Sequence, residues 1–203
     1  TLRSVSYVDA KNGWTVGLFG TIYRTTNGGI EWLPQICPAN KNLYSVHFIN
    51  PNIGWTVGDS ITILHTVNGG TQWTHQKSPI NSRSFYSIFS INQDTTWIVG
   101  QHGEIINSTN GGNTWLRQTS GITKNLWSVH FPSSQNGWAV GDSGLVIHTT
   151  NAGKNWLKQQ SGTTKYLLSV FFTDTLNGYI AGSQGIILRT TNGGGEWTSQ
   201  PSG

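Results

Sequence analysis

The chain has 203 residues, of which only 10% are charged, and its formal net charge is +4. Twelve Lys and Arg against eight Asp and Glu, without a basic run, argue against a nucleic-acid-binding protein. The single cysteine excludes an internal disulfide, and no apolar stretch approaches the roughly 18 residues of a membrane span. Abundant Gly, Ser, Thr and Asn with little charge favour a turn-rich β protein.

Two markers repeat along the chain with one period. The first is Thr/Ser-x-Asn-x-Gly-x-x-Trp, whose tryptophans stand 41, 42, 41 and 41 positions apart. The second is Gly-Trp-x-Val-Gly, with Trp97 after Thr and Tyr179 in place of Trp. Because both keep the same register, they predict a repeat architecture. The residues of the first marker, expected to be structural, are Asn27, Gly29, Trp32, Asn68, Gly70, Trp73, Asn110, Gly112, Trp115, Asn151, Gly153, Trp156, Asn192, Gly194 and Trp197.

Each unit contains four short β-like runs, A to D, which are bounded by Gly, Asn, Asp, Pro and Ser. In the second unit we expect them at 43–48, 55–58, 61–66 and 73–76. No segment has a sustained apolar period of 3.6 residues, so an ankyrin-type or leucine-rich solenoid is disfavoured, and a β-helix coil is usually shorter. Four strands per unit predict an all-β, five-bladed β-propeller. We expect one domain over residues 1–203, with blades at about 2–42, 43–84, 85–125, 126–166 and 167–203.

The first marker reads as the turn between runs C and D. Its Asn is expected to accept hydrogen bonds from backbone N–H groups two residues on, as in an Asx-type turn. The Gly two positions after the Asn never varies, whereas the intervening position holds Ala152 in the fourth unit. We therefore expect a positive φ at the invariant glycine, whereas its neighbour need not have one. The Trp is expected to begin strand D and to pack over the turn.

These residues resemble the Asp-box, or bacterial neuraminidase, repeat, which lies in the C–D turns of propellers. The order Gly-Trp-x-Val-Gly, Gly-x-Ile-x-x-Thr and Asn-Gly-Gly-x-x-Trp is most similar to photosystem II stability and assembly factor-like propellers. The resemblance covers all five units and implies the fold. It does not imply one function, because Asp-box propellers include sialidases, xyloglucan hydrolases, sorting receptors, lectins and assembly factors. The chain departs from the family in having Asn at all five box positions and five units where the assembly factors have seven blades.

Candidate catalytic and metal-binding groups are few. Asp59 and Asp142 occupy the same B–C turn two units apart, and glycoside hydrolysis needs two facing carboxylates. Asp-Ser and Asp-Ser-Gly are, however, also ordinary turn sequences. The five arginines lie at mixed repeat positions, which disfavours a sialidase. Histidines recur as the equivalent pairs His47 with His130 and His65 with His148, but no second ligand type lies near them, so we expect neither a metal nor a cofactor.

Two sets of variable residues indicate a binding face. If the C–D turns lie on one face, the B–C and D–A loops lie on the other, and a basic residue precedes strand A in four units. Such a ring would suit an anionic group, although solvated linkers are the simpler interpretation. The second position of strand A also varies, and either borders the channel or packs between blades. The candidate binding residues are Lys41, Arg83, Lys124, Lys165, Asp59, His102, Asp142, Gln184, Tyr44, Tyr86 and Trp127.

The sequence thus predicts a non-catalytic binding or assembly scaffold for a protein or peptide, including an anionic one. The alternative is a lectin-like carbohydrate-binding propeller, with a glycoside hydrolase a distant third. Low charge and the absence of methionine favour an exported protein, and hence an extracellular or periplasmic location. A closed ring predicts a monomer whose weakest point is the seam between the first and fifth blades. An open arc would instead associate through its two edges.

Overall fold

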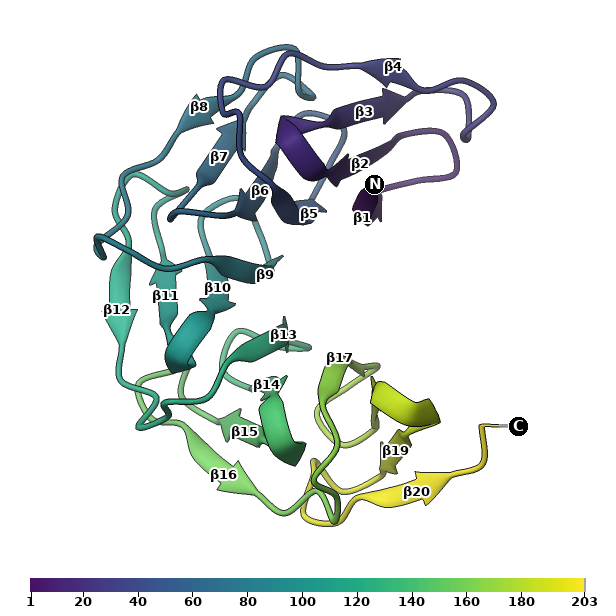
Figure 1. The fold of residues 1–203 in the computed structure, drawn as a ribbon, viewed down its shortest axis with the longest axis vertical. Helices are drawn as coiled ribbons and strands as arrows, with labels where there is room; N and C mark the ends of the chain where they lie inside the picture. The colour runs from purple at the N-terminus through teal and green to yellow at the C-terminus, as the bar shows by residue number, and fades with distance from the viewer. Residues whose placement is uncertain (203) are drawn as a thin grey trace. The chain divides into compact units, whose positions relative to one another are not determined.

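The protein is built from five small β-sheets. The computed structural model describes residues 1–202, which contain β-strands and short 3-10 turns but no α-helix. The strands form five four-stranded sheets, and within each sheet they lie side by side in chain order (Figure 1). Neighbouring strands run antiparallel, so each sheet is an up-and-down meander of the kind that forms a propeller blade. The predicted all-β propeller of five blades is confirmed, and the sheets are called blades 1 to 5 below.

The strands of each blade are lettered A to D in chain order. Blade 1 contains β1 (Leu2–Tyr7), β2 (Gly13–Gly17), β3 (Ile22–Thr25) and β4 (Leu33–Pro34). Blade 2 contains β5 (Leu43–Phe48), β6 (Gly54–Gly58), β7 (Ile63–Thr66) and β8 (Thr74–His75). Blade 3 contains β9 (Phe85–Ser90), β10 (Thr96–Gly100), β11 (Ile105–Ser108) and β12 (Leu116–Gln118). Blade 4 contains β13 (Leu126–His130), β14 (Gly137–Gly141), β15 (Val146–Thr149) and β16 (Leu157–Gln159). Blade 5 contains β17 (Leu167–Phe172), β18 (Gly178–Gly182), β19 (Ile187–Thr190) and β20 (Thr198–Gln200).

Every A strand begins at the residue that the sequence predicts. Short 3-10 turns connect strands B and C in four blades: η1 (Leu18–Gly20), η2 (Gln101–Gly103), η3 (Asp142–Gly144) and η4 (Ser183–Gly185). In blade 2, strands C and D are shorter than expected because Ile61 belongs to the turn and Trp73 precedes its strand. The anchor tryptophan therefore does not begin strand D, which corrects the prediction.

The chain divides into two compact units. One consists of Thr1–Ile98 with Ile106–Leu116, and the other of Val99–Ile105 with Arg117–Gly203. The first unit holds blades 1 and 2 and most of blade 3, and the second holds blades 4 and 5. A single domain over residues 1–203 stays a prediction. None of the helical segments in residues 1–202 has the length and apolar character needed to cross a membrane.

The B strands are the most buried elements. All five residues of β6, Gly-Trp-Thr-Val-Gly, are buried, and Trp55 is fully inaccessible to solvent. The first glycine is required because a Cβ on Gly54 would lie 2.5 Å from the ring of Phe48 on the paired A strand. A Cβ on Gly58 would collide with the carbonyl oxygen of Asn42. The repeated Gly-Trp-x-Val-Gly marker thus reflects close contacts on both ends of the B strand.

Each C–D turn is closed by a pair of side chains, here called the Thr–Asn clasp, which consists of the Thr or Ser that ends strand C and the box Asn. In blade 2, Thr66 Oγ1 accepts the N–H of Gly70 (2.9 Å) and donates to Asn68 Oδ1 (2.9 Å). Asn68 Oδ1 in turn accepts the N–H of Gln72 (2.9 Å). The same bonds recur in the other four blades. The expected acceptor geometry was therefore wrong, because the Asn binds the N–H four residues on and the hydroxyl binds that of the glycine.

The backbone of this turn is left-handed at two successive residues. In blade 2, Gly69 has φ 69° and Gly70 has φ 89°, and in blade 4 Ala152 also has φ 58°. The positive φ expected at the invariant glycine is confirmed, and its neighbour, for which the sequence required none, has one as well. At Gly153 and Gly194 a Cβ would in addition collide with the side-chain amide of a glutamine from the preceding blade, Gln118 and Gln159 respectively.

This glutamine, from the repeated Trp-x-x-Gln, joins one blade to the next. Gln118 Nε2 donates to the carbonyl oxygen of Ala152 (2.9 Å), and its Oε1 accepts the indole N–H of Trp156 (3.3 Å). Gln159 Nε2 likewise donates to the carbonyl oxygen of Gly193 (2.8 Å). In blades 3 and 4 the glutamine therefore holds the C–D turn of the following blade, whereas in blade 2 the equivalent carbonyl, of Gly69, accepts from Trp14 Nε1 (2.9 Å).

Apolar side chains and strand A complete the contacts between successive blades within each unit. Trp14 of blade 1 stacks on Phe48 of blade 2 with 3.6 Å between ring centroids, and Trp138 stacks on Phe172 at 3.7 Å. The hydroxyl of Ser45 accepts the N–H of Ile88 on the next A strand (3.2 Å). Within each unit, successive blades are thus held together by buried aromatic pairs and by hydrogen bonds between neighbouring A strands.

We predict that Gln118→Ala lowers the free energy of unfolding by about 1–2 kcal/mol, because it leaves the Ala152 carbonyl and the Trp156 indole without their partner. Gln200→Ala is the matched control. Among the described residues, Gln200 makes side-chain hydrogen bonds only to Thr198 and Ser199 of its own strand, so its loss should be nearly neutral. Urea denaturation measures both variants. Equal stability of the two would contradict a role for the glutamine between blades.

Candidate functional site

The B–C and D–A loops lie side by side in the structure. The N–H of Gly20 donates to the carbonyl oxygen of Lys41 (2.7 Å), and the N–H of Gly144 donates to that of Lys165 (2.7 Å). In blade 2, the N–H of Ile61 donates to Arg83 in the same way (2.7 Å). The expectation that these two loops share one side of a blade is therefore confirmed.

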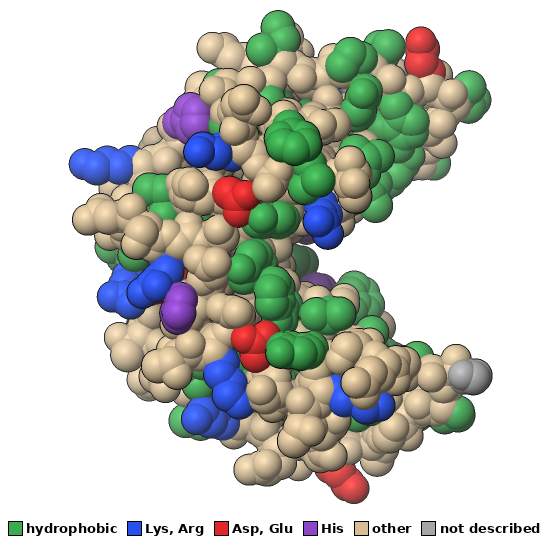
Figure 2. Space-filling view, in the orientation of Figure 1, with side chains coloured by type: hydrophobic (Ala, Val, Ile, Leu, Met, Phe, Trp, Pro, Cys, Tyr) green, Lys and Arg blue, Asp and Glu red, His purple; other side chains and the backbone are tan. Residues whose placement is uncertain are grey.

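The four basic residues predicted for this side all lie in the loops that lead into strand A. Lys41 and Lys124 are exposed, whereas Arg83 and Lys165 are partly buried. Lys165 Nζ donates to the carbonyl oxygen of Gln184 (3.3 Å), so its charge is held close to the B–C turn. Figure 2 shows Lys and Arg side chains at several places on this face, some adjoining one another and others with neutral surface around them. A continuous basic ring across the blades stays a prediction.

The two candidate catalytic carboxylates are occupied by hydrogen bonds. Asp59 accepts from Tyr44 Oη (2.8 Å), Ser84 Oγ (3.0 Å) and Asn42 Nδ2 (2.9 Å). The pKa of the Tyr44 hydroxyl is raised, first by burial and then by its bond to Asp59.

In blade 4, Asp142 accepts from Trp127 Nε1 (2.6 Å) and from the N–H of Asn125 (3.2 Å). Asp59 and Asp142 thus play the same part. Each carboxylate holds the aromatic residue at the second position of the A strand in its own blade.

The aromatic residues predicted for the site are thereby fixed in orientation. Tyr44 and Tyr86 lie together in the first unit, with ring centroids 5.6 Å apart and planes at 60°. Both are partly buried, as is Trp127. A lectin that stacks sugar on these rings stays a prediction.

His102 and Gln184 are the exposed tips of their B–C turns. Both have a left-handed backbone, with φ 55° and 56°. The N–H of His102 donates to Asn125 Oδ1 on the following D–A loop (3.1 Å). The two residues therefore present their side chains outward from equivalent places in blades 3 and 5.

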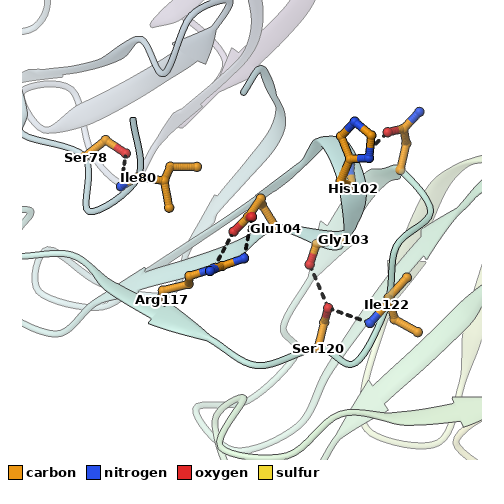
Figure 3. Close-up of polar contacts among 9 residues, drawn as sticks. Ser78, Ile80, His102, Gly103, Glu104, Arg117, Ser120 and Ile122 are labelled. Atoms are coloured by element: carbon orange, nitrogen blue, oxygen red, sulfur yellow. Dashed lines mark hydrogen bonds and ion pairs between the residues drawn. The ribbon is translucent and has the colours of Figure 1, made fainter. Parts of the chain in front are cut away.

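An ion pair in blade 3 between the buried Glu104 and the largely exposed Arg117 was not predicted from the sequence. Arg117 binds Glu104 through two hydrogen bonds, Nε to Oε2 (2.8 Å) and Nη2 to Oε1 (2.6 Å), and Glu104 is only 4% exposed (Figure 3). Ser120 Oγ closes the loop beside it by donating to the carbonyl oxygen of Gly103 (2.7 Å) and accepting the N–H of Ile122 (3.1 Å). The sequence does carry a signal for this ion pair, because the repeat position of Glu104 is neutral in the other four blades: Thr21, Thr62, Leu145 and Ile186.

Grooves follow these loops. One of them, with a volume of about 580 Å³, lies in the first unit between residues 38–41, 60–62 and 75–81. Its counterpart in blade 4, between residues 121–124, 143–146 and 158–160, has about 260 Å³, and that of blade 3, between residues 102–104 and 117–123, has about 380 Å³. The groove of blade 2 therefore has a larger volume than its counterparts in blades 3 and 4.

The recurring histidines have structural surroundings. His65 and His148 stack on the buried Trp55 and Trp138, with centroids 4.5 and 4.1 Å apart, and burial lowers the pKa of both imidazoles. His47 Nδ1 accepts the N–H of Ser90 on the next A strand (3.3 Å). Across residues 1–202, no group of three or more His, Cys, Asp or Glu side chains is placed to hold a metal ion.

Comparison with protein families identifies the relatives of this chain. A family model, the photosynthesis system II assembly factor YCF48, matches residues 32–121 and 79–161, which together make up more than half of the chain. The chain belongs to this family. The resemblance inferred from the repeated motifs is thereby confirmed. No curated protein sequence matches the chain at a significant level.

Solved structures of the same fold include members and non-members of this family. YCF48 bound to D1 peptide is 20% identical, with a TM-score of 0.55 over 98% of this chain and 82% of that one. An ancestral GH74 enzyme is 17% identical, with a TM-score of 0.80 over 98% of this chain but only 31% of its own. Virginiamycin B lyase from Staphylococcus aureus is 14% identical, with a TM-score of 0.84 over 98% and 69%. At these identities the likeness shows the propeller fold alone.

We predict a pH dependence of stability that is due to His47. Burial lowers the pKa of its imidazole from 6.5 to about 4, so between these values the unfolded chain binds the extra proton. The neutral imidazole of His47 makes its full contribution to the free energy of unfolding above pH 6.5. This contribution is lost as the pH falls towards 4, and the loss is at most about 3 kcal/mol.

The matched variant is His47→Ser, because blade 1 has Ser6 at this position and its hydroxyl also accepts the N–H of the next A strand (3.1 Å). Thermal melting of both proteins between pH 7 and 4 should show a smaller loss of stability for the serine variant. Parallel curves would contradict the prediction.

Proposed function

We propose that this protein is a non-catalytic scaffold that binds a polypeptide through the B–C and D–A loops of its blades. The observation that carries the proposal is the state of the loop carboxylates. Asp59 and Asp142 are each engaged by an aromatic side chain of their own blade, at 2.8 and 2.6 Å. We assign these carboxylates the role of orienting the rings rather than that of an acid or base. What the loops offer is aromatic rings, lysines and grooves, which are the means of binding rather than of catalysis.

Family membership supports the same class of function. The related structure named above is of YCF48 bound to D1 peptide, which is a polypeptide partner for that protein. For this chain we propose a peptide or protein partner with carboxylate groups, because lysines such as Lys41 and Lys124 stand exposed on the loop side. The likeness to GH74 and to the lyase carries no activity across at such low identity. An extracellular or periplasmic location remains part of the proposal.

The test is fluorescence anisotropy with fluorescein-labelled decapeptides of three kinds: acidic with aliphatic residues, basic with aliphatic residues, and Gly-Ser only. We expect the acidic peptides to bind, and added salt to weaken them. Lys124→Glu should reduce the affinity by about three- to tenfold, because it places a negative charge on the loop side. Lys154→Glu is the control, since this exposed lysine belongs to the C–D turn.

Two results would contradict the proposal. One is the absence of binding by any peptide together with signal on a glycan array, which would favour the lectin. The other is an equal loss of affinity in both lysine variants, which would indicate a general effect of charge rather than a site on the loops.

A further inference from the structure

Blade 2 departs from the other blades at two places that touch one another. In blades 1, 3, 4 and 5 the B–C turn ends in a left-handed glycine: Gly20, Gly103, Gly144 and Gly185. Blade 2 has Ile61 there, with φ 59°. The connection between its D strand and the next A strand is also longer by one residue. Phe85 lies 12 positions after Trp73, whereas the equivalent residues at the ends of the other D–A connections lie 11 positions apart.

The two departures depend on each other, because the D–A loop passes close to the last residue of the B–C turn. A Cβ on Gly20, Gly103 or Gly144 would collide with a backbone carbonyl of the D–A loop, from Ala39, Ile122 and Thr163 respectively. In blade 2 the extra residue lets the loop pass around the isoleucine side chain. The loop nevertheless keeps its hydrogen bond, from the N–H of Ile61 to the carbonyl oxygen of Arg83 (2.7 Å).

The conformation of Ile61 is unfavourable in itself. A β-branched residue is a clear outlier in the left-handed region, where glycine would be free of strain. Strained positions of this kind persist where the surroundings enforce them, and they cluster at ligand-binding sites. The strain at Ile61 therefore directs attention to what its side chain contacts.

That side chain lines the large groove of blade 2. Ile61 and Ile80 provide apolar surface, and both are partly buried. Ile80 is fixed by its N–H, which donates to Ser78 Oγ (3.2 Å; Figure 3). Lys41, Lys77 and His75 are exposed side chains along the same groove, and no Asp or Glu lines it. With about 580 Å³ it has more than twice the volume of its counterpart in blade 4, which keeps the glycine.

We propose that the groove of blade 2 is the subsite that selects an aliphatic side chain of an acidic peptide. The aliphatic group lies on Ile61 and Ile80, and neighbouring carboxylates of the peptide face Lys41 and Lys77. This inference rests on the proposed function, because it takes a polypeptide to be the ligand. It adds a specificity-determining position that the repeat would otherwise fill with glycine.

The test uses two labelled peptides, Gly-Ser-Asp-Leu-Glu-Gly and the same peptide with Ser in place of Leu. The wild-type protein should bind the leucine peptide about tenfold more tightly. Ile61→Gly restores the residue of the other blades. It relieves the backbone strain but removes the packing of Ile61 against the core, so the variant should stay folded with a modest change in melting temperature, while the preference for leucine should disappear. Ser60→Gly is the matched control: Ser60 also has a positive φ (52°), but its replacement leaves the isoleucine in place, so the preference should remain.

Methyl NMR gives a second measurement that does not depend on the variant. Titration of the leucine peptide should shift the δ-methyl signals of Ile61 and Ile80, and Ile80→Ala should weaken its binding. If the leucine peptide binds but Ile61→Gly keeps the preference, the inference is overturned and the proposed function stands. If neither peptide nor any acidic decapeptide binds the wild-type protein, both are overturned.

Discussion

The Thr–Asn clasp at each C–D turn is the interaction on which the rest of this propeller depends. The hydroxyl that ends strand C binds a glycine N–H, and the Asn beside it binds the N–H four residues on; in blade 2 these bonds are 2.9 Å long. The turn is then fixed with two successive left-handed residues. Its outer carbonyl accepts a side-chain hydrogen bond from the preceding blade: Ala152 accepts from Gln118, and Gly69 accepts from Trp14. One local motif therefore shapes the blade and also prepares the surface on which another blade packs.

Because the clasp and the buried Gly-Trp-x-Val-Gly strand hold each blade, the loops at the other side are free to differ. In blades 1, 2 and 4 the same backbone hydrogen bond joins the B–C and D–A loops, while the side chains of these loops change from blade to blade. Asp59 and Asp142 use this freedom to orient Tyr44 and Trp127. Blade 2 differs further, because Ile61 occupies the left-handed position that is glycine in the other four blades. The binding scaffold proposed above would therefore keep its stability and its recognition in separate parts of each blade.

The sequence predicts the fold well because the repeat samples each structural requirement five times. All five A strands begin where expected, at Leu2 and its equivalents. Finer geometry was less accessible. The offset of the Asn hydrogen bond depends on which N–H the turn brings within reach, and the φ of Ala152 depends on the chain reversal as a whole. For the site, the sequence predicted that the B–C and D–A loops lie on the same side of a blade. The role of Ile61 was not, because its meaning depends on the closeness of the D–A backbone, which spacing alone does not reveal.

The central claim is that the clasp holds each blade, and amide hydrogen exchange tests it most directly. The N–H groups of Gly70, Gly112 and Gly153 donate to buried hydroxyl oxygens, at 2.9, 2.8 and 2.9 Å. If the clasp is as stable as the sheet, these turn amides should be protected to within about tenfold of the strand amides of β6. Exchange of the three glycines at the rate of open loops, with the strands still protected, would contradict the account.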